Sequence, residues 1–511
     1  MNRSRTVIAA AAALALVVAA AVVAGVVVSR DETRSGWTPP GSIADSAPPA
    51  LERFYTQKVT WSDCSSAHCA WITVPIDYAS PDGATTRLRA VVHPATGGAA
   101  KRSILVNPGG PGGSAIDFAG SMASSFGADV RAKFDIVGVD PRGVGRSSPL
   151  KCLSDRAFDS FTAIDPDPDS STEIAALRRS VTDLGNACKK NSGELAAHVS
   201  TVEVAKDMDV VRGLLGRTKL DWFGASYGTE LGAVYAQLFP NKVGRMVLDG
   251  AVDPALGAVE SALGQTTGFQ RAIDAYAEDC VKQKSCPIGR DAKAGLGRIA
   301  GLLARLDRQP MQTRGERRLT EGQAFYGIAV TLYDKATWPY LSRGLAAAFK
   351  GDGSILLTLS DAYFRRGSDG AYSGNLGQVI YAVNCLDSSE QLSQAQTEAL
   401  IPRFEQASPV FGRSLAWGVL ACTDWPLEPS NPLPSISADG APPILVIGTT
   451  RDPATPYEWA QALASQLSSG ALLTRVGDGH TAYNSGNECI TSAVDTFFTD
   501  GSVPKQGLTC R

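Results

Sequence analysis

At 511 residues, with 44% apolar and 19% charged residues, the chain has the composition of an ordinary globular protein, and its length suits two folded units plus a targeting segment. Its formal net charge is only −3, and no long basic or acidic run occurs along it. The sequence therefore lacks the basic footprint of nucleic-acid-binding proteins, and we exclude that class.

The N-terminal residues 1–33 have the pattern of an export segment. Arg3 and Arg5 precede an uninterrupted apolar run from Val7 to Val28, which is the charge order of a secretory signal. The run exceeds the usual apolar core of about 7–15 residues and approaches the ~20 residues that span a bilayer, so a cleaved signal peptide and an uncleaved anchor both stay open. Either way we expect an exported protein, secreted or at the cell surface, that meets the membrane only through this run. Residues 34–50, rich in proline and serine, are expected to be a linker.

Ten cysteines indicate disulfide bonds formed in an oxidising compartment. Metal sites built on cysteine usually need CxxC knuckles or a nearby histidine cluster, and this sequence has neither. Pairing each cysteine with its sequence neighbour leaves none over. As a hypothesis, we take the pairing to be Cys64–Cys69, Cys152–Cys188, Cys280–Cys286, Cys385–Cys422 and Cys489–Cys510.

Short apolar runs alternate with amphipathic stretches over residues 51–250 and again over residues 441–511. This alternation predicts a doubly wound, mostly parallel α/β sheet whose strands are buried on both faces. Between residues 251 and 440 helical patterns replace it, and we expect a large helical cap inserted over the crevice where such sheets bind ligands. The predicted strands are Leu88–Val92, Ile104–Val106, Phe134–Val139, Leu220–Phe223, Met246–Leu248, Ile444–Ile447 and Leu472–Val476. The clearest helical patterns in the insertion are Ala258–Asp279, Ala292–Leu306 and Glu321–Leu332.

A strand-to-helix turn at Ser226 carries the sharpest chemical signal. Residues 224–228 (Gly-Ala-Ser-Tyr-Gly) follow the strand Leu220–Phe223 and precede the helical pattern Thr229–Leu238. In this context a Gly-x-Ser-x-Gly turn raises the serine Oγ above the sheet, beside the positive end of the helix. A plain glycine-rich turn is the alternative, but the strand before and the helix after favour Ser226 as the nucleophile of an α/β hydrolase.

A serine nucleophile needs a base, and only one of the four histidines has the right position. In α/β hydrolases the chain order is serine, acid, histidine. His68, His93 and His198 all precede Ser226, which leaves His480. It lies on a glycine-rich loop just after the last predicted strand, and we predict that it is the base.

The acid of the predicted triad is Asp452. It follows the strand Ile444–Ile447, and a carboxylate at that strand end can reach the imidazole Nδ1 and fix its tautomer. Asp478, only two residues before His480, is a competitor whose spacing suits a turn contact better. Asp452 also precedes Pro453, so a capping aspartate in a turn is a further interpretation.

The loop after the strand Ile104–Val106 has the sequence NPGGPGGS (residues 107–114). Its glycines allow backbone N–H groups to point at a developing negative charge, and it lacks the Lys-Ser/Thr ending of a phosphate-binding loop. We predict an oxyanion hole with one donor from Gly109 or Gly110 and the other from the N–H of Tyr227. This chemistry requires no metal and no organic cofactor.

Taken together, these segments resemble the prolyl-iminopeptidase-like serine peptidases, most of all the secreted bacterial tripeptidyl aminopeptidases. The resemblance implies the α/β-hydrolase fold, a triad of Ser226, Asp452 and His480, and removal of short peptides, typically tripeptides, from free N-termini. It extends from about Trp61 to the C-terminus, and residues 443–510 resemble the C-terminal segment of that family. It rests on NPGGPGGS, DPRGVGRSS (140–148), GASYGTELGAVYAQLFP (224–240), VLDGAVDP (247–254), AVNCLD (382–387) and ACTDWP (421–426), together with the segments around Asp452 and His480.

An enzyme that acts on peptides with a free N-terminus has to hold the substrate's ammonium group, and a carboxylate is suited to that task. Asp387, close to Cys385, is our candidate, although an exposed helix acid explains it equally well. Two other functions stay open: an esterase or lipase that uses the same triad on small esters or amides, and a non-catalytic surface binding protein with this fold.

Overall fold

The structure is a computed structural model that describes Trp37 and residues 41–43, 47–428 and 433–511. Within these residues, no helix combines the length and the apolar character needed to cross a membrane. The predicted export segment, residues 1–33, and much of the predicted linker lie outside the described residues.

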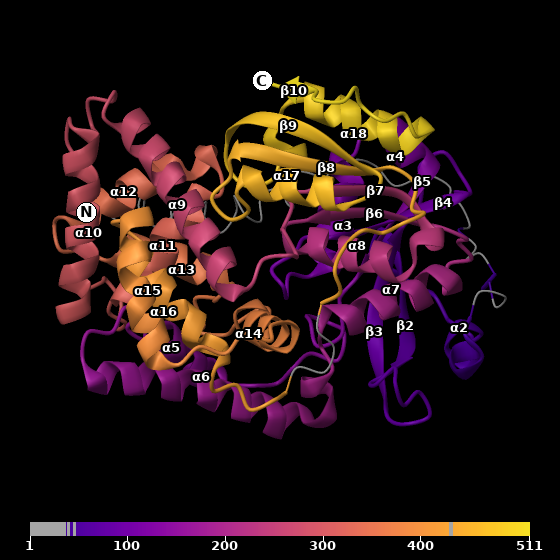
Figure 1. The fold of residues 1–511 in the computed structure, drawn as a ribbon, viewed down its shortest axis with the longest axis horizontal. Helices are drawn as coiled ribbons and strands as arrows, with labels where there is room; N and C mark the ends of the chain where they lie inside the picture. Colours follow the sequence, from indigo (N-terminus) through magenta and orange to yellow (C-terminus); the bar gives the residue numbers. More distant parts are fainter. Residues whose placement is uncertain (1–36, 38–40, 44–46, 429–432) are drawn as a thin grey trace, which may run out of the picture.

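One ten-stranded sheet, in the order β1-β2-β3-β5-β4-β6-β7-β8-β9-β10, forms the half of the molecule seen at the right of Figure 1. Strands β5 to β10 in this order run parallel, and β1, β2 and β3 join the β5 edge in antiparallel pairs. The strands are β1 (Ser62–Cys64), β2 (Ala67–Pro75), β3 (Thr85–His93), β4 (Arg102–Asn107), β5 (Phe134–Val139), β6 (Leu220–Ala225), β7 (Val243–Asp249), β8 (Ile444–Arg451), β9 (Gly470–Asp478) and β10 (Thr509–Cys510). All seven predicted strands are present; β1 and β10 are too short, and β2 too mixed in polarity, to stand out in the sequence.

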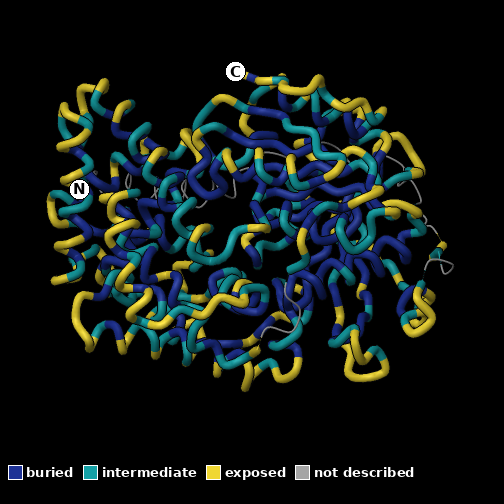
Figure 2. Tube along the Cα trace, in the orientation of Figure 1, coloured by how far each residue is buried: buried dark blue, intermediate teal, exposed yellow. Residues whose placement is uncertain are grey.

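Helices cover both faces of the sheet, and the alternation of side chains along each strand decides which core a residue joins. In β8, Ile444 and Val446 share a core with α7, α8 and α17, whereas Leu445 and Ile447 share one with α3, α4 and α18. Figure 2 shows these strands as largely buried, with exposed residues gathered on outer helices and turns. The helices are α2 (Glu52–Tyr55), α3 (Ala115–Ser125), α4 (Ala128–Lys133), α7 (Thr201–Leu214), α8 (Tyr227–Leu238), α17 (Tyr457–Gln466) and α18 (Glu488–Asp500).

A layer of helices is inserted between β7 and β8 and has apolar clusters of its own (Figure 1). Its helices are α9 (Ala258–Cys280), α10 (Ala292–Arg308), α11 (Glu321–Ala329), α12 (Trp338–Ala348), α13 (Ser354–Phe364), α14 (Leu376–Asp387), α15 (Gln394–Ala407) and α16 (Gly412–Gly418). The predicted fold class is therefore confirmed: a doubly wound, mostly parallel α/β sheet with a large helical cap inserted before β8, the strand that leads to Asp452.

Two helices that precede Ser226 in the sequence also contact the cap. They are α5 (Asp155–Thr162) and α6 (Ser171–Ser192), which lie beneath the cap in Figure 1. Arg366 of the cap donates to Asp159 of α5 at 2.6 and 2.8 Å, and Arg178 of α6 donates to Asp424 at 2.7 and 2.9 Å. The helical layer is thus built from two separate stretches of chain, and the domain limits 51–250, 251–440 and 441–511 stay a prediction.

The disulfide pairing expected from sequence neighbours is confirmed at all five positions. The bridge Cys385–Cys422 links the end of α14 to a short 3-10 helix, Val419–Cys422, within the cap. It therefore fixes the end of the helix that carries Asp387.

The strand order places a ligand-binding position between β4 and β6. From β4 the chain crosses to β5 on one side and later returns to β6 on the other, so the winding direction reverses there. Ligands of open α/β sheets bind beyond the carboxyl ends of the strands at this reversal. Those two strand ends lead into the NPGGPGGS loop and into Ser226.

Candidate active site

Ser226 occupies a sharp turn between β6 and α8. Its φ and ψ are 57° and −129°, a region that a residue with a side chain rarely adopts. Both flanking glycines are required sterically, because a Cβ on Gly224 would lie 2.1 Å from the Gly228 carbonyl oxygen and one on Gly228 would lie 2.6 Å from that of Asn107. The turn is held by the Ser226 N–H, which donates to the Asp249 carbonyl at 2.9 Å.

His480 lies beside Asp452, as the sequence predicts. Its Nδ1 is 2.8 and 2.9 Å from the two Asp452 carboxylate oxygens, and Thr455 Oγ1 is 3.3 Å away. Among the described residues, the opposite ring atom, Nε2, is buried without a hydrogen-bond partner. A proton held on Nδ1 by the carboxylate leaves Nε2 as the basic nitrogen, which is the arrangement a general base requires.

Of the two candidate acids, Asp452 contacts the His480 imidazole and is held in place by further hydrogen bonds. Asp452 is 1% exposed and accepts from the N–H groups of Ala454 and Thr455 at 2.9 Å. Asp478 instead forms a bidentate pair with Arg451, at 2.5 and 2.9 Å. Burial by itself lowers the pKa of His480, but the adjacent Asp452 carboxylate outweighs it and raises that pKa above its ordinary value.

Two other parts of the fold hold the His480 loop in place. The Asp249 carboxylate, at the end of β7, accepts from the N–H groups of Ala482 and Tyr483 at about 2.9 Å. From the cap, the Tyr333 carbonyl accepts the His480 N–H at 2.8 Å, and its ring meets the imidazole edge-on with centroids 5.2 Å apart. The sequence carried no signal for Tyr333, because only the folded cap brings it to this loop.

The NPGGPGGS loop packs directly against the turn that carries Ser226. A Cβ on Gly109 would lie 2.8 Å from both the Ser226 Cβ and the Tyr227 nitrogen. The Gly109 N–H already donates to the Asn107 side chain at 2.9 Å, whereas the Gly110 N–H has no protein acceptor in the described part of the chain. The Tyr227 N–H is the first of α8 and so has no partner inside the helix. Of the two candidate glycines, Gly110 is therefore the better donor.

Helix α14 extends from the NPGGPGGS loop to the start of α7. At its start, Leu376 is so close to the loop that a Cβ on Gly112 would lie 3.0 Å from its Cα. At its end, the Asp387 carboxylate accepts from Thr201, from the N–H at 2.9 Å and from the hydroxyl at 2.6 Å. Thr201 Oγ1 is also 2.6 Å from the Tyr227 hydroxyl. The structure thus brings Asp387 to the residue that follows Ser226.

A second carboxylate near Asp387, that of Glu230, was missed in the sequence. It lies in the first turn of α8, four residues after Ser226 in the sequence. Both acids are mostly buried; burial raises the pKa of Asp387 to about 7, and burial followed by the charge of Asp387 raises that of Glu230 to about 8. No hydrogen-bond donor within the described residues contacts the Glu230 carboxylate. The sequence did carry a signal for Glu230, because it is the only charged residue among the small and apolar residues of that helix turn.

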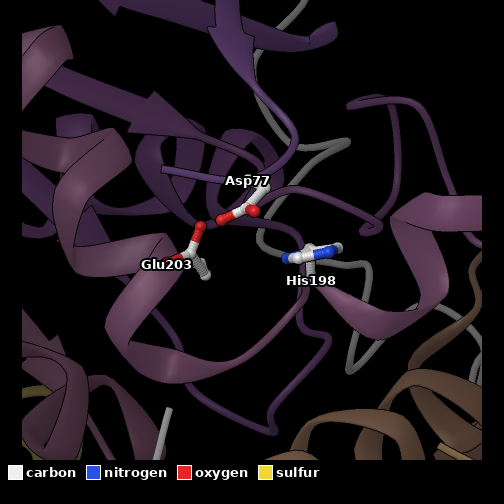
Figure 3. A group of neighbouring side chains, drawn as sticks. All are labelled: Asp77, His198 and Glu203. Atoms are coloured by element: carbon white, nitrogen blue, oxygen red, sulfur yellow. The ribbon is translucent and has the colours of Figure 1, made fainter. Parts of the chain in front are cut away.

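Elsewhere, Asp77, His198 and Glu203 form a group with the side-chain types of a metal site (Figure 3). Their side chains point toward one another from a loop and from the start of α7. Glu203, however, already pairs with Lys206 at 2.8 Å and with Arg142 at 3.5 Å. Two cations beside it make this group unsuitable for a further positive ion.

Comparison with known proteins places this geometry among serine hydrolases. A family model described as TAP-like protein matches residues 408–510. The chain is 36% identical over 478 residues to the serine protease Hip1 of Mycobacterium tuberculosis, which covers 89% of this chain and 91% of that protein. It is 39% identical over 460 residues to carboxylesterase B of the same organism (88% of this chain, 87% of the relative). It is 31% identical over 469 residues to tripeptidyl aminopeptidase of Streptomyces lividans (88% and 86%).

Proposed function

Because this chain belongs to the TAP-like family of α/β-hydrolase serine peptidases, we propose that it hydrolyses peptides from a free N-terminus, releasing tripeptides through an acyl-enzyme on Ser226. That it is a serine hydrolase of peptidase type follows from the family. The proposal concerns the finer points: the catalytic residues, the requirement for a free N-terminus and the length of the product.

In the proposed mechanism, His480 Nε2 accepts the Ser226 hydroxyl proton while Oγ attacks the scissile carbonyl. Asp452 keeps the other imidazole proton on Nδ1 and stabilises the imidazolium that forms. The negative oxygen of the tetrahedral intermediate accepts from the N–H groups of Tyr227 and Gly110. His480 then protonates the leaving amine. A water molecule, deprotonated by His480, attacks the acyl-enzyme; the Ser226 ester bond breaks, Ser226 regains its proton, and the tripeptide leaves with a free carboxylate.

The observation that carries the exopeptidase proposal is the pair of acids formed by Glu230, in the first turn of α8, and Asp387, at the end of α14. Two mostly buried carboxylates whose charges act on each other are unfavourable when both are ionised, and a cation between them relieves that cost. A peptide's N-terminal ammonium is such a cation. An endopeptidase or a simple esterase has no use for a cation-binding pair at this place.

The deciding experiment is mass spectrometry of the products from an unblocked decapeptide and from its N-acetylated form. We expect successive tripeptides from the unblocked peptide and almost none from the acetylated one. Equal cleavage of both forms, or cleavage at internal bonds first, would contradict the proposal.

A second candidate function, hydrolysis of small esters, has one observation in its favour: a relative at 39% identity is named carboxylesterase B. The same catalytic residues serve both reactions. A panel that pairs tripeptide anilides with short acyl esters separates them, since an esterase accepts the esters and leaves the peptides intact.

We also propose that the folded part works outside the cytoplasm. Five disulfides support this, since such bonds persist in oxidising compartments. Fractionation of cells that make the full chain tests this location, and we expect the protein in the extracellular or surface fraction. Labelling of free thiols in that fraction should show no reactive cysteine.

Removing either acid is expected to weaken substrate binding selectively. Glu230→Gln and Asp387→Asn should each raise KM for a free tripeptide anilide about 10- to 100-fold, since a charge-assisted hydrogen bond is lost. KM for an N-acetylated ester should change little. Glu458→Gln, which alters an exposed glutamate paired with Arg271, is the matched control and should leave both KM values unchanged. Equal losses on both substrates would argue for a structural role of the acids.

The pH dependence of binding follows from the same two groups. As pH rises from 6 to 8 in the unliganded enzyme, Asp387 and Glu230 ionise through their pKa values of about 7 and about 8, so KM for a free peptide should fall. Above pH ~8 the substrate's own amine, with a pKa of about 7.7–8.0, loses its proton and KM should rise again. In the Glu230→Gln variant, the fall in KM between pH 6 and 8 should be smaller. A KM profile that is identical for free and N-acetylated substrates would contradict the assignment.

A further inference from the structure

We propose that four carboxylates where the cap meets the connection between α5 and α6 form a binding site for Ca²⁺. They are Asp165, Asp167, Asp307 and Glu321, and one oxygen of each lies within 4.8 Å of all the others. Asp165 and Asp167 lie between α5 and α6, Asp307 in the last turn of α10, and Glu321 at the first position of α11. The proposal is independent of the reaction proposed above.

The ligand set favours Ca²⁺ over Mg²⁺. Calcium takes about six to eight oxygen ligands in a flexible geometry, and carboxylates are among the ligands it prefers. Magnesium keeps several of its waters and usually binds through only one or two carboxylates. A group of four carboxylates that gather one oxygen each in the same place therefore suits Ca²⁺ better.

Two oxygens in the group are buried without any protein partner. Glu321 is only 4% exposed, and within the described residues neither its Oε2 nor Asp165 Oδ2 has a hydrogen-bond partner. Buried carboxylate oxygens in folded proteins are almost always paired, because an unsatisfied one retains its full desolvation cost. These two therefore point to a ligand that the chain itself does not supply.

No basic side chain of the described residues forms an ion pair with the group; the charges of Arg413 and Arg308 act on Asp167 and Asp307 only from farther away. Across the described ranges, no lysine or arginine lies within 4.0 Å of any of the four carboxylates. Arg413, which is nearby, donates to the backbone carbonyls of Asp167 and Pro168, both at 3.3 Å, and pairs with Glu405. The fully buried Asp207, by contrast, pairs with Arg142 at 2.7 Å.

The backbone prevents the carboxylates from simply moving apart. A Cβ on Gly322 would lie 2.5 Å from the Ile164 carbonyl oxygen, so the start of α11 rests directly on the segment that carries Asp165. Buried carboxylates held this close together repel one another unless a cation or a proton lies between them. A divalent cation satisfies the same oxygens without protonation and joins the cap to the α5–α6 connection.

Calcium binding is tested on the purified full chain after treatment with EDTA. We expect CaCl₂ at 10 mM to raise Tm by about 3–8 °C, as for a site with Kd near 10⁻⁴ M, and MgCl₂ to have a smaller effect. Tb³⁺ luminescence should show one bound ion that Ca²⁺ displaces. Glu321→Gln and Asp165→Asn should each abolish the Tm shift and the Tb³⁺ signal.

Asp77→Asn, in the group of Figure 3, is the matched control and should retain both responses. If Glu321→Gln fails to fold, Asp165→Asn together with the Tb³⁺ titration of the unaltered chain decides the question. Absence of a Ca²⁺-dependent Tm shift and of Tb³⁺ binding in the unaltered chain would overturn the proposal. Loss of the Ca²⁺ response in Asp77→Asn would also overturn it. A third contrary result is a higher Tm of Glu321→Gln and Asp165→Asn without metal, combined with no Ca²⁺ binding by the unaltered chain, because it would indicate that the carboxylates share protons instead of an ion.

Discussion

Replacing Ser226 with alanine is expected to lower kcat on a tripeptide anilide by on the order of 10⁶-fold, because the proposed acyl-enzyme forms on the Ser226 hydroxyl. The variant should keep the fold, since alanine is smaller and the turn is held by backbone bonds such as the one from the Ser226 N–H to Asp249. Initial rates measured together with Tm separate loss of chemistry from loss of structure.

Labelling with a fluorophosphonate gives an independent readout of the same prediction. The unaltered, fully oxidised chain should be labelled at Ser226 and Ser226→Ala should not. Ser148→Ala is the matched control, because Ser148 is another serine with a positive φ, 44°, and should leave the rate and the labelling unchanged. If the unaltered chain takes no label, the non-catalytic binding protein with this fold becomes the better interpretation.

Changing Asp452 to asparagine is expected to reduce kcat by about 10⁴-fold with little change in KM. The asparagine amide presents a donor to Nδ1, so the imidazole holds its proton on Nε2, and that nitrogen no longer accepts the Ser226 proton. The loss should shrink at pH values where hydroxide deprotonates the serine directly. Steady-state kinetics between pH 6 and 10 measure both effects.

Asp478→Asn is the decisive control for that result, because Asp478 was the rival acid in the sequence. Its partner is Arg451, and its removal should cost only a few-fold in rate, as exposed ion pairs contribute about 0–1 kcal/mol. A larger loss in Asp478→Asn than in Asp452→Asn would reverse the assignment.

The cap covers the candidate site and also contributes residues to it. It supplies Tyr333 to the His480 loop and Asp387 to the pair of acids, and the proposed Ca²⁺ site joins it to the α5–α6 connection. Changes in cap stability are therefore expected to appear in kinetics as well as in Tm.

What the sequence determined by itself was local. The Ser226 turn and the strands follow from neighbouring residues: two glycines around a strained serine, and continuous apolar runs. These features need only backbone sterics and polarity patterns, which a single stretch of chain displays. The cysteine pairing was a hypothesis from sequence order, which the structure confirms even for the pairs that lie 21, 36 and 37 residues apart. His480 was predicted from chain order among four histidines.

Tertiary structure alone decided which distant groups meet. The proximity of Asp387 to Glu230 depends on how the end of α14 meets the start of α7, and the four-acid group depends on the packing of α10 and α11. Contacts between elements so far apart along the chain arise from how apolar helix faces pack, and no local pattern specifies that packing. For the same reason the sequence was enough to propose Ser226 as the nucleophile, while the groups proposed to select its substrate became visible only in the fold.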